Sequence, residues 1–239
     1  MASVGIDGRL LIWDLEQRRV QHRIDSVFKK GYSVDWDPRG RYLAVGTNDG
    51  ALVWDIDSWE VVHRHSEGRA VLGVAWSPRG DVLAVMENAE AGRPATIIPV
   101  STEDWTNLDE FETSHVGVFT CKMDWSEDGR LLAFPAALQI GIWDAVEKRQ
   151  REPLPGHRSS VQAVSFHPSN HRFLASAGRD AEVILWNVDR GEADLRLKGH
   201  SHGVAAVEWH PEGEALATSS WDGTCLLYTS DAADDPTLV

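Results

Sequence analysis

Tryptophan placement constrains the fold of this chain more than any other feature of its 239 residues. Eight of the eleven tryptophans fall into two series that repeat along the sequence. The first series has gaps of 41, 89 and 43 residues and consists of Trp13, Trp54, Trp143 and Trp186. The second consists of Trp36, Trp76, Trp125 and Trp209, with Phe166 in the remaining place. A period of about 40 to 45 residues indicates one repeated supersecondary unit, and the gap of 89 indicates a unit that lacks its Trp.

Each unit shows the same order of apolar runs and turns. A first strand ends at a second-series Trp or Phe, and a turn such as "DPRGR" or "HPEGE" follows. A second strand such as "YLAVG" leads to a third strand that carries a Trp-Asp pair, as in "LVWDI", and then to a more polar fourth strand. Short apolar runs at regular spacing, separated by turn residues and lacking a helical period, predict an all-β array of four-stranded antiparallel units.

"GH" near the start of a unit and "WD" near its end, in one register over several units, resemble the WD-repeat (WD40-type) family of β-propellers. The resemblance covers residues 2 to 224 and implies a propeller with about five to six blades represented here, part of one with about seven. It also implies a buried relay of His, Ser or Thr, Asp and Trp. The matching residues are His157, Ser176, Asp180 and Trp186, and then His200, Thr218 and Asp222.

Both ends of the pattern are incomplete. The first unit begins partway through a second strand, and the last unit loses the repeat after Thr224. The stretch "CLLYTSDAAD" resembles the translation of an adapter used to make sequencing libraries, so we expect a propeller fragment over 1–224 and a non-native tail over 225–239. Two alternatives remain open: a degenerate last strand with an acidic tail, and a five-bladed ring closed by the two incomplete ends.

Composition narrows the classes of function. The net charge of −14 would repel nucleic-acid phosphates, so we expect no direct nucleic-acid binding. No apolar stretch is long enough to span a membrane, and no basic-then-apolar leader opens the chain. Two cysteines form no disulfide framework. We therefore expect a cytoplasmic protein, or a nuclear one if the source is eukaryotic.

Residue types that support catalysis or cofactor binding occur without the required spacing. Neither a G-x-S-x-G turn nor a glycine-rich phosphate loop is present. The ten histidines show no ligand spacing for a metal, and we expect those outside the relay to lie on the surface. Cys121 lies in an expected first strand and is interpreted as a core residue. We predict no catalytic residues, no metal and no cofactor.

The resemblance also indicates where a partner would bind. In the family, the residue before the turn Asp points onto the face used for ligands, and this position is filled by Ile6, Asn48, Arg179 and Trp221. Exposed Trp and Arg are typical anchors of interfaces. Partner-binding candidates are therefore Trp221, Arg179 and Asn48, with Phe119 before a first strand and Arg93 in a long loop as further candidates.

These features favour a noncatalytic scaffold that binds proteins or peptides as a subunit or module of a larger assembly. The net charge favours a basic partner. Two other functions remain open: a regulatory or targeting module of a larger enzyme, such as a kinase or a nucleotide hydrolase, and a subunit of a chromatin or RNA-processing complex.

Overall fold

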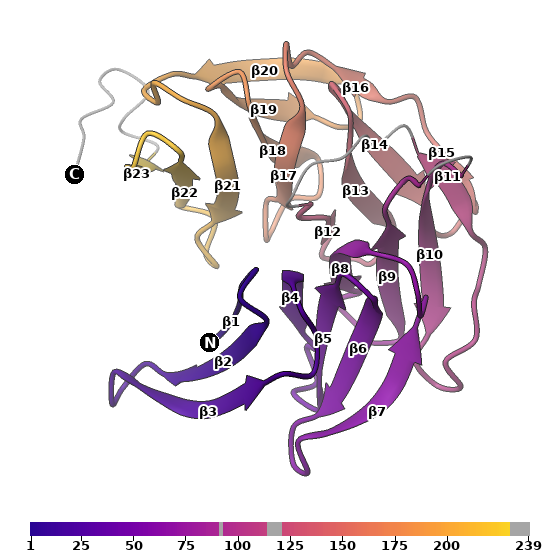
Figure 1. Cartoon of the computed structure of the whole chain (residues 1–239). Coiled ribbons are helices and arrows are strands. Elements are labelled where there is room, and N and C mark those ends of the chain that lie inside the picture. The colour runs from indigo at the N-terminus through magenta and orange to yellow at the C-terminus, as the bar shows by residue number, and fades with distance from the viewer. Residues whose placement is uncertain (91–92, 114–120, 230–239) are drawn as a thin grey trace. The chain divides into compact units, whose positions relative to one another are not determined.

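The computed structural model describes residues 1–90, 93–113 and 121–229, which form strands joined by turns and contain no helix. No helix in this part of the chain therefore has the length and apolarity needed to cross a membrane. The chain divides into two compact units, Met1–Cys121 and Lys122–Val239. Each unit consists of antiparallel sheets (Figure 1), and each sheet is called a blade below.

The first unit holds three blades. The first blade has the strands β1 (Ala2–Val4), β2 (Arg9–Asp14) and β3 (Arg19–Asp25). The second has β4 (Gly31–Trp36), β5 (Tyr42–Thr47), β6 (Gly50–Asp55) and β7 (Glu60–His65). The third has β8 (Val71–Trp76), β9 (Val82–Glu87), β10 (Ala95–Ser101) and β11 (Phe111–Thr113). β10 is the third strand of the unit that lacks a Trp.

The second unit also holds three blades. Its first has β12 (Asp124–Trp125), β13 (Leu131–Ala136), β14 (Gln139–Asp144), β15 (Arg149–Gln150) and β16 (Leu154–Pro155), and both last strands pair with β14. Its second has β17 (Val161–Phe166), β18 (Phe173–Gly178), β19 (Val183–Asn187) and β20 (Glu192–Leu197). Its third has β21 (Val204–Trp209), β22 (Ala215–Ser220) and β23 (Cys225–Thr229).

The predicted fold class is confirmed: the chain is all-β, and its six blades have the antiparallel order of a propeller. β23 lies in the stretch for which the sequence suggests an adapter origin, and that origin stays a prediction. The total of about seven blades also stays a prediction.

The core lies between neighbouring blades, which explains why the central strands are apolar on both faces. In β6, Leu52 and Trp54 pack with the core residues of the first blade, whereas Val53 packs with those of the third. Successive side chains of a strand point to opposite faces of its sheet. A strand buried on both faces therefore reads as a continuous apolar run, as "ALVW" does.

The Trp-Asp strand bends at its tryptophan. The pairing between third and fourth strands shifts register immediately before Trp13, Trp54 and Trp186. Such β-bulges twist a strand locally and redirect its side chains. The chain then turns back toward the fourth strand. The residue five positions after the Trp, or after Val100 in the third blade, has a positive φ in every blade where it is described: Arg18 (51°), Trp59 (56°), Trp105 (58°), Lys148 (52°) and Gly191 (69°).

First strands of neighbouring blades are joined by hydrogen bonds that involve the second Trp series. The Trp76 backbone N–H donates to Asp35 Oδ2 (2.8 Å) and its indole Nε1 donates to the Asp35 carbonyl (3.2 Å). In the second unit, the Phe166 N–H donates to Asp124 Oδ2 (2.7 Å), and Trp209 Nε1 donates to the Ser165 carbonyl (3.2 Å). These bonds fix how far one blade is shifted along the next.

Candidate partner-binding surface

A chain of buried polar side chains supports the loop between β18 and β19. Trp186 Nε1 donates to Ser176 Oγ (2.8 Å), which lies 2.8 Å from His157 Nε2. His157 Nδ1 lies 3.0 Å from both carboxylate oxygens of Asp180. An indole N–H can only donate, and a neutral imidazole that donates from Nδ1 accepts at Nε2. Ser176 therefore accepts from Trp186 and donates to His157, and each buried polar atom has a partner.

Asp180 is held as a carboxylate at the surface end of this chain. Burial opposes its ionisation, but hydrogen bonds from His157 and from the Arg158 and Glu182 backbone N–H groups outweigh burial and lower the pKa of Asp180 to about 2. A charge-assisted hydrogen bond of this kind is stronger than a neutral one. The pairing fixes the turn in which Asp180 lies, and with it the preceding residue, Arg179.

The next blade repeats the arrangement with one change. His200 Nε2 lies 2.8 Å from Thr218 Oγ1, and His200 Nδ1 lies 2.9 Å from Asp222 Oδ2. Hydrogen bonds from the Thr224 hydroxyl and from backbone N–H groups, together with the one from His200, hold the pKa of Asp222 well below its usual range. Tyr228 occupies the place of Trp186, and its buried hydroxyl has no hydrogen-bond partner among the described residues.

The two supported turns bring Arg179 and Trp221 together. The Arg179 guanidinium carbon lies 4.9 Å from the centre of the Trp221 ring, in a cation–π contact. The Arg179 N–H donates to the Ser160 carbonyl (2.9 Å), and the Trp221 N–H donates to the Gly203 carbonyl (3.1 Å). The Trp221 side chain is 52% exposed, and Arg179 is also exposed. We call these two residues the Arg–Trp patch.

The Trp221 ring packs against Gly203. A Cβ atom on Gly203 would lie 2.8 Å from two carbon atoms of the indole and 3.0 Å from the Arg179 Cα. Such distances are too short for a real side chain, so only glycine lets the indole lie flat against this loop. The ring is therefore placed by the backbone of the neighbouring loop and stays exposed on its other side.

Among the other predicted contact residues, Asn48 joins the turn between β5 and β6 to the segment before β4. Its Oδ1 accepts hydrogen bonds from the Lys29 and Lys30 backbone N–H groups, at 3.2 and 2.8 Å. Ile6 is 72% exposed. Arg93 is exposed, and its backbone N–H and carbonyl exchange hydrogen bonds with those of Glu90. Phe119 lies outside the described residues.

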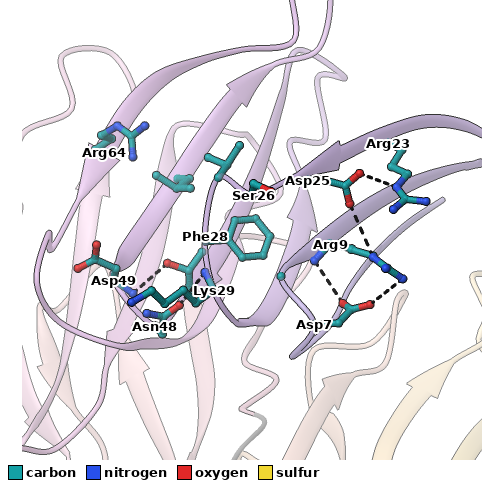
Figure 2. Close-up of a pocket in the computed structure, with 14 residues that line it drawn as sticks. Asp7, Arg9, Arg23, Asp25, Ser26, Phe28, Lys29, Asn48, Asp49 and Arg64 are labelled. Carbon is teal, nitrogen blue, oxygen red and sulfur yellow. Dashed lines mark hydrogen bonds and ion pairs between the residues drawn. The ribbon is translucent and has the colours of Figure 1, made fainter.

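A polar cavity of about 910 Å³ lies beside Asn48 in the first unit (Figure 2). On one side, Arg9 lies between Asp7 and Asp25, with Nη1 3.4 Å from Asp7 Oδ2 and Nε 3.7 Å from Asp25 Oδ1. Arg23 Nε lies 2.6 Å from Asp25 Oδ2. The other side carries four further polar side chains: Lys29, Asn48, Asp49 and Arg64. These half-exposed ion pairs shape the cavity more than they stabilise the fold.

Sequence reasoning missed two tryptophans that share a repeat position. Trp59 and Trp105 both occupy the left-handed turn after the third strand. Trp59 stacks on His22 of the preceding blade (centroids 4.4 Å apart), and Trp105 stacks on His63 of the preceding blade (4.5 Å). The prediction that the histidines outside the relay lie on the surface holds only in part for His63, which is half-buried with its Nε2 atom enclosed. The trace in the sequence is that Trp59 lies five residues after Trp54 and Trp105 lies five after Val100, which fills the place of the missing Trp.

Ser3 was also missed. It lies ten residues before Trp13, as Ser176 lies ten before Trp186, and the Trp13 Nε1 atom donates to Ser3 Oγ (2.8 Å). Asp7 lies where Asp180 does relative to its Trp, but its carboxylate contacts Arg9 instead of a histidine. Ser3 and Asp7 match Ser176 and Asp180 when "ASVGIDGRLLIWD" of the first unit is aligned with "ASAGRDAEVILWN" of the fifth.

The described residues give no arrangement for metal binding: no group of three or more His, Cys, Asp or Glu side chains is placed to hold an ion. The Cys121 side chain is buried beside Met86 Sδ (3.0 Å), and burial raises the pKa of its thiol. A thiol with a raised pKa is a poor nucleophile.

Three segments of the chain, residues 22–55, 148–187 and 191–229, match the family model "WD domain, G-beta repeat". A maize protein, "Guanine nucleotide-binding protein subunit beta", is 28% identical over 83% of this chain and 55% of its own length. "WD repeat-containing protein srw1" of Schizosaccharomyces pombe is 27% identical over 80% of the chain and 34% of its own length. "Periodic tryptophan protein 2 homolog" of Dictyostelium discoideum is 25% identical over 92% and 24%. The chain spans about half the length of these relatives, or less.

Proposed function

Because this chain carries WD40 repeats, we propose that it is a noncatalytic scaffold that binds another protein through the Arg–Trp patch. The observation that carries the proposal is the pairing of Arg179 with a half-exposed Trp221 that is not part of the buried core. Large aromatic and Arg side chains dominate the binding energy of many interfaces. A rigid blade that presents two such residues loses little conformational entropy when a partner binds.

Several features of the chain agree with this function. Ser176, His157 and Asp180 are the residue types of a catalytic triad, but here they hydrogen-bond to one another and support one loop. Ser176 is fully buried. A nucleophile must be accessible to substrate. The partner in this proposal is a protein or peptide, and the scaffold works as part of a larger assembly. We place it in the cytoplasm, where its two free cysteines would remain reduced.

The test is quantitative affinity capture with the purified chain as bait. Bait with Trp221→Ala should lose at least about 90% of the partner that the unchanged bait retains, since removal of a central anchor costs about 2 kcal/mol or more. Val146→Ala is the matched control, because Val146 is 72% exposed and lies in the turn between β14 and β15, at the other edge of a blade. All baits should melt at similar temperatures.

If the Trp221→Ala bait and the unchanged bait recover every partner equally, the Arg–Trp patch does not bind the partner. A partner lost only with Val146→Ala would move the binding surface to the opposite edge of the blades.

A further inference from the structure

We propose that the Arg–Trp patch binds an acidic peptide segment, with a carboxylate paired to Arg179 and a neighbouring apolar side chain against Trp221. This inference rests on the proposed function, since it names the chemistry of the partner at the same surface. It also reverses the expectation of a basic partner that the net charge of −14 suggests.

The first step is the state of the Arg179 guanidinium. Its carbon atom lies over the Trp221 ring, 4.9 Å from the ring centre, and among the described residues its N–H groups make no hydrogen bond or ion pair. A guanidinium carries five N–H donors, so these donors are available to a partner. A carboxylate matches two of these donors at once. Arg179 is therefore oriented for a carboxylate before a partner arrives.

The second step is the fate of the acidic groups in the same loops. Asp180 is bound to His157 and to backbone N–H groups, and Asp222 is bound to His200 in the same way. Glu182 pairs with Arg196 (2.6 Å). Each carboxylate thus already has hydrogen-bond donors from its own blade, which makes it a poorer partner for a lysine or arginine of another protein.

The third step is the presence of a second cation without a partner. Arg158 lies two residues before Ser160, whose carbonyl accepts the Arg179 N–H. The Arg158 side chain is exposed and has no ion pair among the described residues. The loops around the patch therefore present guanidinium groups that have no partner, whereas their carboxylates already have hydrogen-bond donors.

The fourth step weighs this local charge against the net charge of the chain. At physiological ionic strength, charges more than about 8 Å apart are largely screened from each other. A carboxylate bound at Arg179 lies in direct contact with one cation, whereas most of the acidic side chains lie elsewhere on the surface. The contact cation therefore decides which partner is bound, and the net charge mainly slows the approach of an acidic one.

The experiment selects partners without assuming one. A displayed library of random dodecapeptides is selected on the immobilised chain, and the retained pool is sequenced. We expect enrichment of Asp or Glu beside a large apolar residue. Selected peptides should then bind at least about tenfold more weakly to Arg179→Gln, because a hydrogen-bonded charge pair contributes about 1.5 to 3 kcal/mol. Higher salt should weaken binding to the unchanged chain.

Arg190→Gln is the matched control, because Arg190 is exposed in the turn between β19 and β20, at the other edge of the same blade. It should bind the selected peptides like the unchanged chain. Selection of Lys-rich or Arg-rich peptides that still depend on Trp221 would overturn the acidic preference and leave the proposed function standing. A pool in which no peptide depends on Trp221 would overturn both.

Discussion

At the scale of single residues, Ser176 connects the two halves of the buried relay. Its hydroxyl accepts from Trp186 and donates to His157, so Ser176→Ala leaves an indole N–H and an imidazole nitrogen without partners. Each buried unpaired group costs about 1 to 3 kcal/mol. We expect Ser176→Ala to lower the free energy of unfolding by roughly 2 to 4 kcal/mol, measured by urea denaturation.

Thr218→Val in the neighbouring blade is the matched comparison. The Thr218 hydroxyl serves His200 but no tryptophan, since Tyr228 stands in that place. Thr218→Val should therefore cost about 1 kcal/mol less than Ser176→Ala. If the two substitutions cost the same, the indole hydrogen bond contributes nothing measurable, and the relay ends at the histidine.

Residues at one repeat position can differ in what their side chains do. The sequence places Asn48, Arg179 and Trp221 at equivalent positions, because the period fixes the course of the backbone. It does not fix what each side chain then contacts. Asn48 accepts from backbone N–H groups just before the first strand of its own blade, whereas Trp221 lies over Gly203 and meets Arg179 of the preceding blade. The backbone position is shared, but the side-chain contacts differ, so spacing alone could not predict them.

At the scale of elements, the stack of His63 on Trp105 joins the fourth strand of one blade to a turn of the next. Burial lowers the pKa of His63 below 6.5, and burial with the nearby charge of His63 lowers that of His65. The folded chain therefore binds fewer protons than the unfolded chain just below pH 6.5. Stability from these histidines is complete above that pH and is lost as the pH falls through the lowered folded values.

His63→Phe keeps a flat ring on Trp105 and removes the proton. We expect the fall in melting temperature between pH 7 and pH 5 to shrink by roughly half, because His65 remains. At pH 7 the variant should be at least as stable, since the unpaired Nε2 atom is gone. His171→Phe is the control, as His171 is exposed in a turn. An unchanged pH profile in His63→Phe would show that protonation of His63 has no part in the acid loss.

The left-handed turn after each third strand gives a second test at this scale. Gly191 has φ near 69°, and a Cβ atom on it would meet nothing within 4 Å. Gly191→Ala therefore isolates backbone strain from side-chain clashes. We expect a loss of about 1 kcal/mol in unfolding free energy, because an L-residue is disfavoured in this conformation. Glu192→Ala, one residue on and exposed, should be neutral. A neutral Gly191→Ala would show that this turn carries no strain.

The strands could be predicted from the sequence because their burial imposes a pattern. Apolar runs ending at Trp or Phe correspond to β4, β8, β17 and β21, and even β10, which has no Trp, follows from its place in the period. The stacks of Trp59 and Trp105 were not predicted, since they depend on positive φ values in turns that admit Arg, Trp, Lys and Gly alike. A turn with so permissive a residue choice leaves little trace in a single sequence.

At the scale of the whole molecule, the blades within each unit bury their apolar faces against one another. The clusters around Trp186 and around Tyr228 share the blade β17–β20, which contributes Ile184 to one and Val183 to the other. In repeat proteins of this kind, stability is approximately a sum of unit terms and nearest-neighbour terms. A defect in one blade should therefore weaken the blades it touches more than distant ones.

Hydrogen exchange of the Ser176→Ala variant tests this expectation along the whole chain. Amides of β17–β20 should exchange fastest relative to the unchanged chain, amides of β13, β14, β21 and β22 should show intermediate effects, and those of β4–β7 should change least. The reason is that Ser176 lies in β18, in the blade between the blade of β13 and β14 and the blade of β21 and β22, and its hydrogen bonds join segments of its own blade. Glu192→Ala is again the control. A uniform rise in exchange over all described blades would mean that the chain unfolds as one cooperative body, and the nearest-neighbour account would be wrong.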